Sequence, residues 1–213
     1  MANTINIEEN KYQFIEMLKN QITREGAAID KLIYKLEHSD FFTAPCSLRY
    51  HLAVPGGLCQ HSLNVFNELV RLNTLYEAGF SNETLAICGL LLDIEQMNKF
   101  ELTSKNTKVY CETGSKSDIL GKFEWKSELG YQVRDVEDRF IYGHHGQNSE
   151  YIINSYIPLT LEESVAITNH MGGIYDEYRS LDMPSIFKRY SLATLLYMAD
   201  FMCTYMIDSK FEN

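Results

Sequence analysis

Apolar residues recur along most of this chain at the three- and four-residue spacing of amphipathic helices. Residues 7–37 are predicted from this spacing to form one or two helices, interrupted at Gly26. The apolar positions that carry the pattern are Ile15, Leu18, Ile22, Ile29, Leu32, Ile33 and Leu36. The N-terminal part of the chain is therefore predicted to be helical.

A loop with the sequence FFTAPCSLRYHLAVPGG follows, and its prolines and glycines predict a helix after it, from about His61 to Leu75. Ser81 is a favourable N-cap for the next helix, which is expected to reach Met97. This helix should be central, because nearly all of its residues are apolar. Further helices are predicted at about 149–157, 160–170 and 186–208, the last opening after Pro184.

Residues 105–142 differ from the rest of the chain, because aromatic residues are separated there by glycines. This segment is predicted to be a β-hairpin or an irregular flap. Its aromatic residues include Tyr110, Phe123, Trp125 and Tyr131. The pattern as a whole predicts an all-α fold with this small excursion. The length of 213 residues is ample for one buried core, so a single globular domain is expected.

Charge and composition narrow the possible partners. The net charge is −10, and no run of lysine or arginine could neutralise a phosphate backbone, so binding to a nucleic-acid duplex is not expected. No stretch approaches the roughly 18 apolar residues of a spanning helix, and the N-terminus lacks a secretion signal. We therefore expect a cytoplasmic protein that does not bind membranes, with its oligomeric state open. The five scattered cysteines predict reduced packing residues.

Five polar side chains stand out from their surroundings. Asp93 and Asp200 lie within apolar helical segments, where a carboxylate is costly unless a cation or hydrogen-bond donors compensate it. The histidines of interest, His61, His145 and His170, lie at helix ends or in a glycine-flanked loop. Three imidazoles and two carboxylates make a suitable ligand set for a divalent ion.

Each of these residues also has a structural interpretation when taken alone. A histidine at a helix end is commonly a cap, and either aspartate could pair with an arginine or a helix N-terminus. His51, in the loop before Gly56, could face a pocket, whereas His38 is expected at a solvated helix end.

The string FFTAPCSLRYHLAVPGGLCQHSLNVFNEL resembles the opening motif of HD-domain metal-dependent phosphohydrolases, in which YH, GGL and then a His followed by Ser or Thr begin the site. LLLDIEQMNKF is similar to the family's His-Asp helix, and YGHHGQNS to its His-His-Gly-Glu-Lys-Ser loop. ITNHMGG and LLYMADFMCTY resemble its next histidine and its final aspartate. The resemblance implies an HD-domain helical bundle, with an HD-like domain over 41–208 and an N-terminal helical segment, 1–40, that packs on the core.

The same resemblance implies a site. Its metal ligands would be His61, Asp93, His145, His170 and Asp200, with Asp93 bridging two ions and His144 as the alternative for His145. Asp93, His51 and Gln96 are the residues expected to act in catalysis. The implied cofactor is one or two divalent ions, from manganese, iron, zinc, nickel or magnesium, bound weakly. The implied partner is a small phosphorylated substrate or a nucleotide.

Four positions depart from the family pattern. Leu92 replaces the histidine of the His-Asp doublet, Gln96 replaces a common lysine, and Gln147 and Asn148 replace glutamate and lysine. Glu95 is not expected to supply the lost ligand, because two residues along a helix turn it roughly 200° away from Asp93. Each ion would keep three protein ligands, so a weakened or single-metal site is expected.

Two functional hypotheses follow from these observations. The first is a metal-dependent phosphohydrolase with reduced activity on a nucleotide or small phosphate ester. The second is a catalytically inactive HD fold that binds a nucleotide ligand or a protein partner, which the clustered departures favour. A helical module without any ligand is the third interpretation, and the acids within apolar helices, Asp93 and Asp200, argue against it.

Overall fold

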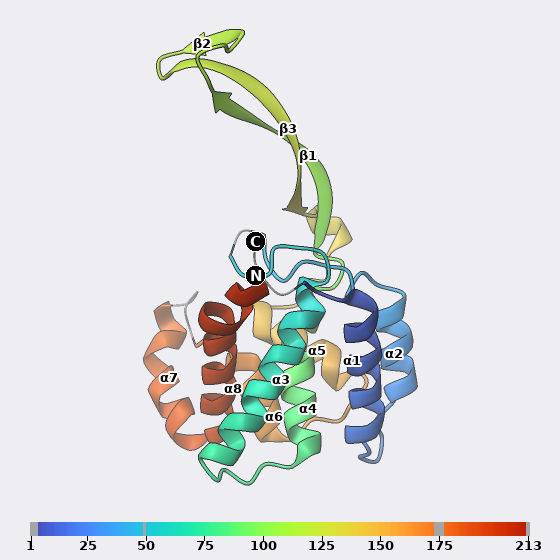
Figure 1. Cartoon of the computed structure of the whole chain (residues 1–213). Helices are drawn as coiled ribbons and strands as arrows, with labels where there is room; N and C mark the ends of the chain where they lie inside the picture. The colour runs from blue at the N-terminus through green and yellow to red at the C-terminus, as the bar shows by residue number, and fades with distance from the viewer. Residues whose placement is uncertain (1–3, 49, 173–176, 212–213) are drawn as a thin grey trace.

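The computed structural model describes residues 4–48, 50–172 and 177–211 (Figure 1). In these residues, helices α1 to α8 pack into one body, and a curved β-ribbon rises from one end of it. The helices are α1 (Ile7–Gln21), α2 (Ile29–Glu37), α3 (Gly57–Leu75), α4 (Asn82–Leu91), α5 (His145–Asn154), α6 (Leu161–Asn169), α7 (Glu177–Arg189) and α8 (Ser191–Met202). Short helical turns are η1 (Ile94–Gln96), η2 (Val136–Asp138), η3 (Cys203–Ile207) and η4 (Asp208–Phe211).

The predicted all-α class is wrong, because the chain combines helices with an antiparallel sheet. Strands β1 (Phe100–Tyr110), β2 (Lys116–Asp118) and β3 (Gly121–Val133) form a sheet in the order β1-β3-β2. The pairing of β1 with β3 runs from Phe100 opposite Val133 to Tyr110 opposite Phe123. The fold is therefore mixed rather than a purely helical HD-type bundle. The sequence signal for the sheet is a two-residue alternation of apolar and polar residues within 100–133, which places the apolar side chains on one face of the ribbon. The prediction of an all-α class does not take this alternation into account.

The predicted N-terminal helices are present as α1 and α2, and Gly26 lies between them with a φ of +84°. Asn6 caps α1 by accepting a hydrogen bond from the backbone N–H of Glu9. Phe14 and Leu18 of α1 are fully buried in the same cluster as residues of α3, α4, α6 and α8. Helices α1 and α2 thus contribute to the core of the body.

Helix α4 ends earlier than predicted. Ser81 does cap it, but the α-helix stops at Leu91 rather than Met97, and the chain continues through the turn η1. Asp93, with a φ of −107°, lies at the break. This break changes the directions of the residues that follow Asp93, which matters for the site described below. Pro184, predicted to precede the last helix, instead lies inside α7.

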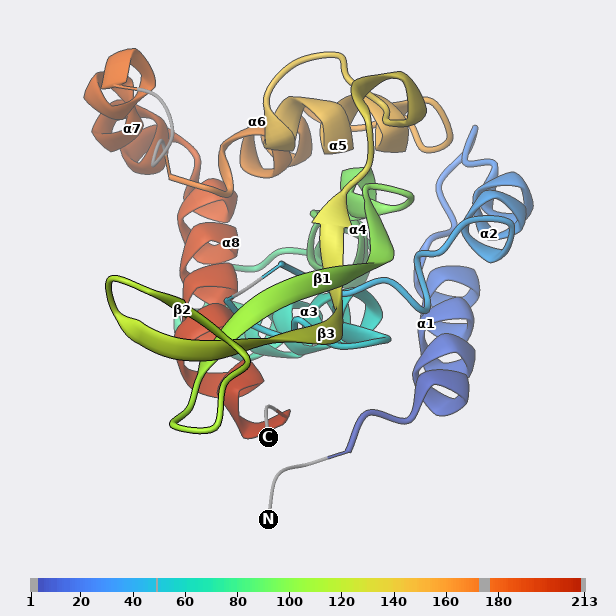
Figure 2. The same ribbon diagram turned by 90° about the horizontal axis from the view of Figure 1, so that it is seen from above.

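The core is a continuous apolar cluster in which α3 and α4 cross closely. A Cβ atom on Gly89 of α4 would lie 2.7 Å from the Cα of Phe66 on α3, so only glycine allows this approach. Leu92 belongs to the same buried cluster. Viewed from above, the ribbon extends over the ends of α3 and α8 (Figure 2). None of the helices in the described ranges has the length and apolar character to cross a lipid bilayer.

Candidate metal centre

The five predicted ligands gather at one place. The Nε2 atom of His145 lies 2.7 Å from Oδ1 of Asp93, and Nε2 of His170 lies 3.4 Å from the same oxygen. The Nε2 atom of His61 lies 3.6 Å from Oδ2 of Asp93 and 3.1 Å from Oδ1 of Asp200. Three imidazoles from α3, α5 and the end of α6 therefore converge on one carboxylate, with Asp200 of α8 beside it.

Close contact between α5 and α6 sets the positions of two of these rings. A Cβ atom on Gly146 would lie 2.3 Å from the carbonyl oxygen of Thr168, so the two helices meet at their backbones. His145 begins α5, and His170 is the C-cap of α6. Their ring centroids are 4.9 Å apart. The main-chain contact thus brings both imidazoles to the same side of Asp93.

The second nitrogen of each imidazole also has a partner. His61 Nδ1 lies 2.7 Å from Oδ2 of Asp208, and His145 Nδ1 lies 2.5 Å from Oε1 of Glu95. His170 Nδ1 lies 2.6 Å from the carbonyl oxygen of Ile167. Histidines that bind metals usually donate their other N–H group to a carboxylate or a backbone carbonyl in this way. The three rings are therefore held with Nε2 turned towards Asp93.

The geometry of His170 indicates that the residues suit a cation. A carbonyl oxygen can only accept, so Nδ1 of His170 carries the proton, and in the neutral ring Nε2 holds a lone pair. That Nε2 atom is buried and has no hydrogen-bond partner among the described residues. The candidate ligand atoms of Asp93, His145 and His170 all lie within 4.8 Å of one another. A divalent ion would satisfy the lone pair and fits this set of donors.

The electrostatics of the group fit a site built for positive charge. Burial alone would raise the pKa of Asp93, but the charge of His145 and its hydrogen bond outweigh burial and hold that pKa well below its usual range. Burial likewise opposes the charge of His145, yet Asp93 and Glu95 raise its pKa to about 10. For His61, Asp208 and Asp200 overcome burial and raise the pKa well above its ordinary value. Without metal, the rings of His61 and His145 therefore carry the positive charge that faces Asp93 and Asp200.

His51 lies next to this group. Its Nε2 atom is 3.2 Å from Sγ of Cys46, and its ring centroid is 4.8 Å from that of His61. Burial, and then the neighbouring charge of His61, lower the pKa of His51. Its Nδ1 atom is buried without a hydrogen-bond partner among the described residues. Cys46, His51 and His61 form a second group of donor atoms within 4.8 Å.

The group opens into a cavity of about 840 Å³, a size typical of sites for small molecules. Its walls include Asp93, His145, His170, Asp200, His51, Gln96 and Lys99, and the aromatic residues Tyr50, Phe100, Tyr197, Phe201 and Tyr205. Gln96 donates a 3.4 Å hydrogen bond from Nε2 to Oδ2 of Asp93. The two further residues predicted to act in catalysis, His51 and Gln96, thus both line the cavity that Asp93 lines.

Sequence reasoning missed three charged residues near the site. Asp208 holds His61, Glu95 holds His145, and Lys99 donates a 2.6 Å hydrogen bond from Nζ to Oε1 of Glu95. The prediction that Glu95 is turned roughly 200° away from Asp93, and so does not supply the lost ligand, assumes a helix that reaches Met97. Because the α-helix stops before Asp93, Glu95 is buried and meets His145 instead.

Three of the four positions that depart from the motifs the sequence resembles have structural roles. Leu92 is fully buried in the apolar cluster and is not part of the cavity wall. Oε1 of Gln147 accepts a hydrogen bond from the backbone of His144. Oδ1 of Asn148 accepts hydrogen bonds from the backbone N–H groups of 142 and 143. His144 itself is exposed at the start of α5, so His145 is the ring that faces Asp93.

No protein-family model matches this chain, and comparisons with curated proteins and with solved structures likewise give no match.

Proposed function

We propose that the protein is a metal-dependent phosphohydrolase of the HD type, acting on a nucleotide or another small phosphate ester with reduced activity. The observation that carries the proposal is the convergence of three Nε2 atoms on Asp93, with the opposite nitrogen of every ring held by a separate acceptor. Side chains that serve only as helix caps would not share this orientation.

The ligands divide into two overlapping sets. His61, Asp93 and Asp200 would hold one divalent ion, and Asp93, His145 and His170 a second, with Asp93 shared. Divalent ions at such a site supply Lewis acidity towards a phosphoryl group. Leu92 offers no lone pair, so the first set has lost a ligand, which is the physical reason for expecting weak binding and reduced activity.

Other residues of the cavity would position the substrate. Lys99 is the lysine of the cavity wall, and its Nζ can bind a phosphoryl oxygen while Glu95 keeps it in place. Gln96 holds Oδ2 of Asp93, which fixes the carboxylate plane. Neutral His51 can donate or accept a hydrogen bond at the cavity wall. The chain thus supplies orientation and charge around the reacting phosphoryl group.

The second candidate is an inactive domain that binds a nucleotide or a protein partner. The observation that favours it is that Leu92, Gln147 and Asn148 serve packing and loop contacts, and the described contacts give them no role in the cavity. A binding domain could keep the metal ligands and lose catalytic groups. Activity, rather than metal content, therefore separates the two candidates.

The test compares the wild-type chain with Asp93→Asn and with the control Asp118→Asn, whose carboxylate pairs with Lys108 on the ribbon. Protein purified without chelator is assayed for bound metal by elemental analysis and for hydrolysis of nucleotides and a generic phosphodiester with added manganese. We expect bound metal and slow hydrolysis in the wild type and the control, and loss of both in Asp93→Asn. Metal without hydrolysis supports the binding domain, and a chain that takes up no metal overturns the proposal.

A further inference from the structure

The β-ribbon has one mainly apolar face and one mainly polar face. Residues directly opposite each other in an antiparallel pair have side chains on the same face, and successive residues alternate between faces. The register of β1 and β3 therefore places eight large apolar or aromatic residues on one face, called here the apolar ribbon face. Phe100 and Phe123 are buried, and the six that reach solvent are Leu102, Tyr110, Trp125, Leu129, Tyr131 and Val133. Glu124, Lys126 and Glu128 lie on the other face. Lys108 lies on the apolar ribbon face, where its Nζ is 4.4 Å from the centroid of the Phe123 ring and pairs with Asp118 at 2.7 Å.

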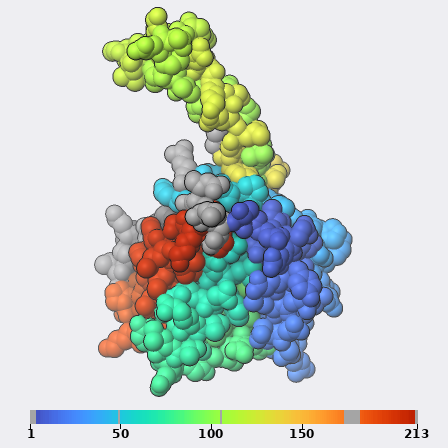
Figure 3. Space-filling model, in the orientation of Figure 1, coloured from blue at the N-terminus to red at the C-terminus, as the bar shows by residue number. Residues whose placement is uncertain are grey.

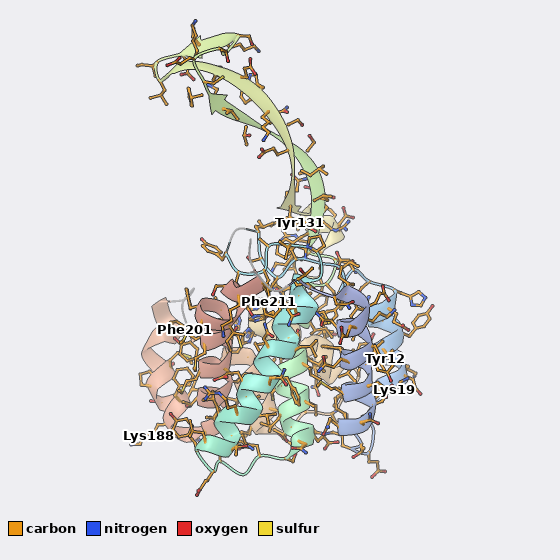
Figure 4. All side chains as sticks on the ribbon, viewed as in Figure 1. Tyr12, Lys19, Tyr131, Lys188, Phe201 and Phe211 are labelled. Carbon is orange, nitrogen blue, oxygen red and sulfur yellow. The ribbon has the colours of Figure 1, made fainter. Side chains whose placement is uncertain are left out.

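Much of the apolar ribbon face is open to solvent. Leu129 is 74% exposed, Leu102 56% and Trp125 49%. Beyond its base the ribbon stands away from the helical body, and its side chains project into open space (Figures 3 and 4). Tyr131, labelled in Figure 4, lies near the base and is half-buried. A two-stranded ribbon without a covered face is only marginally stable in water, so we expect another surface to pack against this face.

We propose that the apolar ribbon face packs against the same face of a second copy of this chain. A large aromatic residue has about 150–250 Å² of surface, and the six residues of this face that reach solvent expose about half of theirs on average. The apolar side chains of the face therefore present roughly 500 Å² of accessible surface per copy. Two such faces would together bury about 1,000 Å², the lower bound for a specific interface. The contact is isologous, since each copy contributes the same surface, and two ribbons can stack as sheets do in a sandwich.

The distribution of charge favours this occupant. The ribbon, residues 100–133, contains five lysines and five acidic residues and is neutral, whereas the whole chain carries −10. The net negative charge therefore belongs to the rest of the chain, and ribbons that project from it can meet without bringing the charged bodies together. A neutral ribbon does not suit a nucleic acid, which needs a basic surface. None of the six residues is a proposed metal ligand, so the inference is independent of the proposed function.

The test measures the mass of the full chain in solution by sedimentation velocity over a range of concentrations. We expect a species of twice 24.6 kDa in the wild type. Leu129→Lys and Trp125→Lys should raise the dissociation constant of the dimer at least about tenfold, because each buries a charge in the contact. Gln132→Lys is the matched control: it makes the same charge change on the opposite face, next to Glu101.

Three results would overturn the proposal. The first is a wild-type chain that is monomeric at every concentration, which would leave the apolar ribbon face to a different partner. The second is a dimer that persists unchanged in Leu129→Lys and Trp125→Lys. The third is equal dissociation in Gln132→Lys. Circular dichroism of each variant checks that the helical body remains folded. Beyond its base, the ribbon stands away from this body (Figure 3).

Discussion

His61 and Asp208 are 147 residues apart in the sequence and share a 2.7 Å contact between Nδ1 and Oδ2 in the fully buried interior. The other oxygen of Asp208 accepts a 2.7 Å hydrogen bond from Asn64. Asp208, in the turn η4, thus fixes the orientation of the His61 ring near the start of α3. This relationship turns Nε2 of His61 towards Asp93 and Asp200.

Replacing Asp208 with asparagine should weaken metal binding without removing a ligand. An amide holds the His61 ring less firmly and does not favour its positive charge, and such outer contacts commonly change metal affinity by about 10 to 100-fold. Competition with a metal-binding indicator measures the affinity. Asn64→Ala serves as a comparison, since it releases Asp208 but leaves its carboxylate on His61. Unchanged affinity in Asp208→Asn would contradict the orienting role.

Metal binding should release protons at neutral pH. The pKa of His145 is about 10 in the metal-free protein, because Asp93 and Glu95 outweigh the effect of burial, so this ring is protonated at pH 7. A cation bound to Nε2 must displace that proton. Calorimetric titrations in buffers of different ionisation enthalpy give the number released. We expect at least about one proton per bound ion, and fewer in Glu95→Gln; binding without proton release would show that His145 is not a ligand.

The metal-free protein should lose stability as the pH rises. His145 has a folded-state pKa of about 10 and an ordinary value of 6.5, so its contribution is complete below pH 6.5 and is lost as the pH approaches 10. His61 contributes in the same direction, since its pKa is also raised. Urea unfolding with chelator across this window measures the effect, on the order of a few kcal/mol. A flat profile would contradict the ion pairs of these rings.

Leu92→His should raise hydrolysis while lowering the stability of the metal-free protein. To supply the missing ligand atom, the imidazole must turn from the apolar cluster towards Asp93, and replacing the fully buried Leu92 costs about 2–5 kcal/mol. Leu92→Gln is the control, because it introduces a similar polar group without imidazole. Thermal unfolding and phosphodiester hydrolysis with manganese are measured on the same samples. A loss of stability with no gain in activity would favour the binding domain over the enzyme.

The five side chains that converge at the candidate site could be singled out from the sequence because they are polar residues among apolar ones or at helix ends. Asp93 and Asp200 have apolar neighbours on both sides, which makes a carboxylate conspicuous. The residues that orient the rings could not be predicted. Asp208 lies in a short C-terminal turn without periodicity, and the direction of Glu95 depends on where α4 stops, which is decided by tertiary packing.

The apolar face of the ribbon could not be predicted for a related reason. Its aromatic residues indicated a hairpin, but polar residues such as Ser104, Asn106 and Ser127 interrupt the apolar face and obscure the alternation. Only the register of β1 against β3 shows that Ser104, Asn106 and Ser127 share one face with Trp125 and Leu129. Cross-strand pairing of this kind joins residues distant in the sequence and is not encoded in local propensity.

The backbone contact at Gly146 means that the pocket can be dismantled without altering any polar atom. One added methyl group there would wedge apart two helices whose main chains touch, and would carry the rings of His145 and His170 away from each other. The spacing of the candidate ligands therefore depends on the packing of the backbone, so a substitution of Gly146 would disrupt the candidate site with every donor side chain still present.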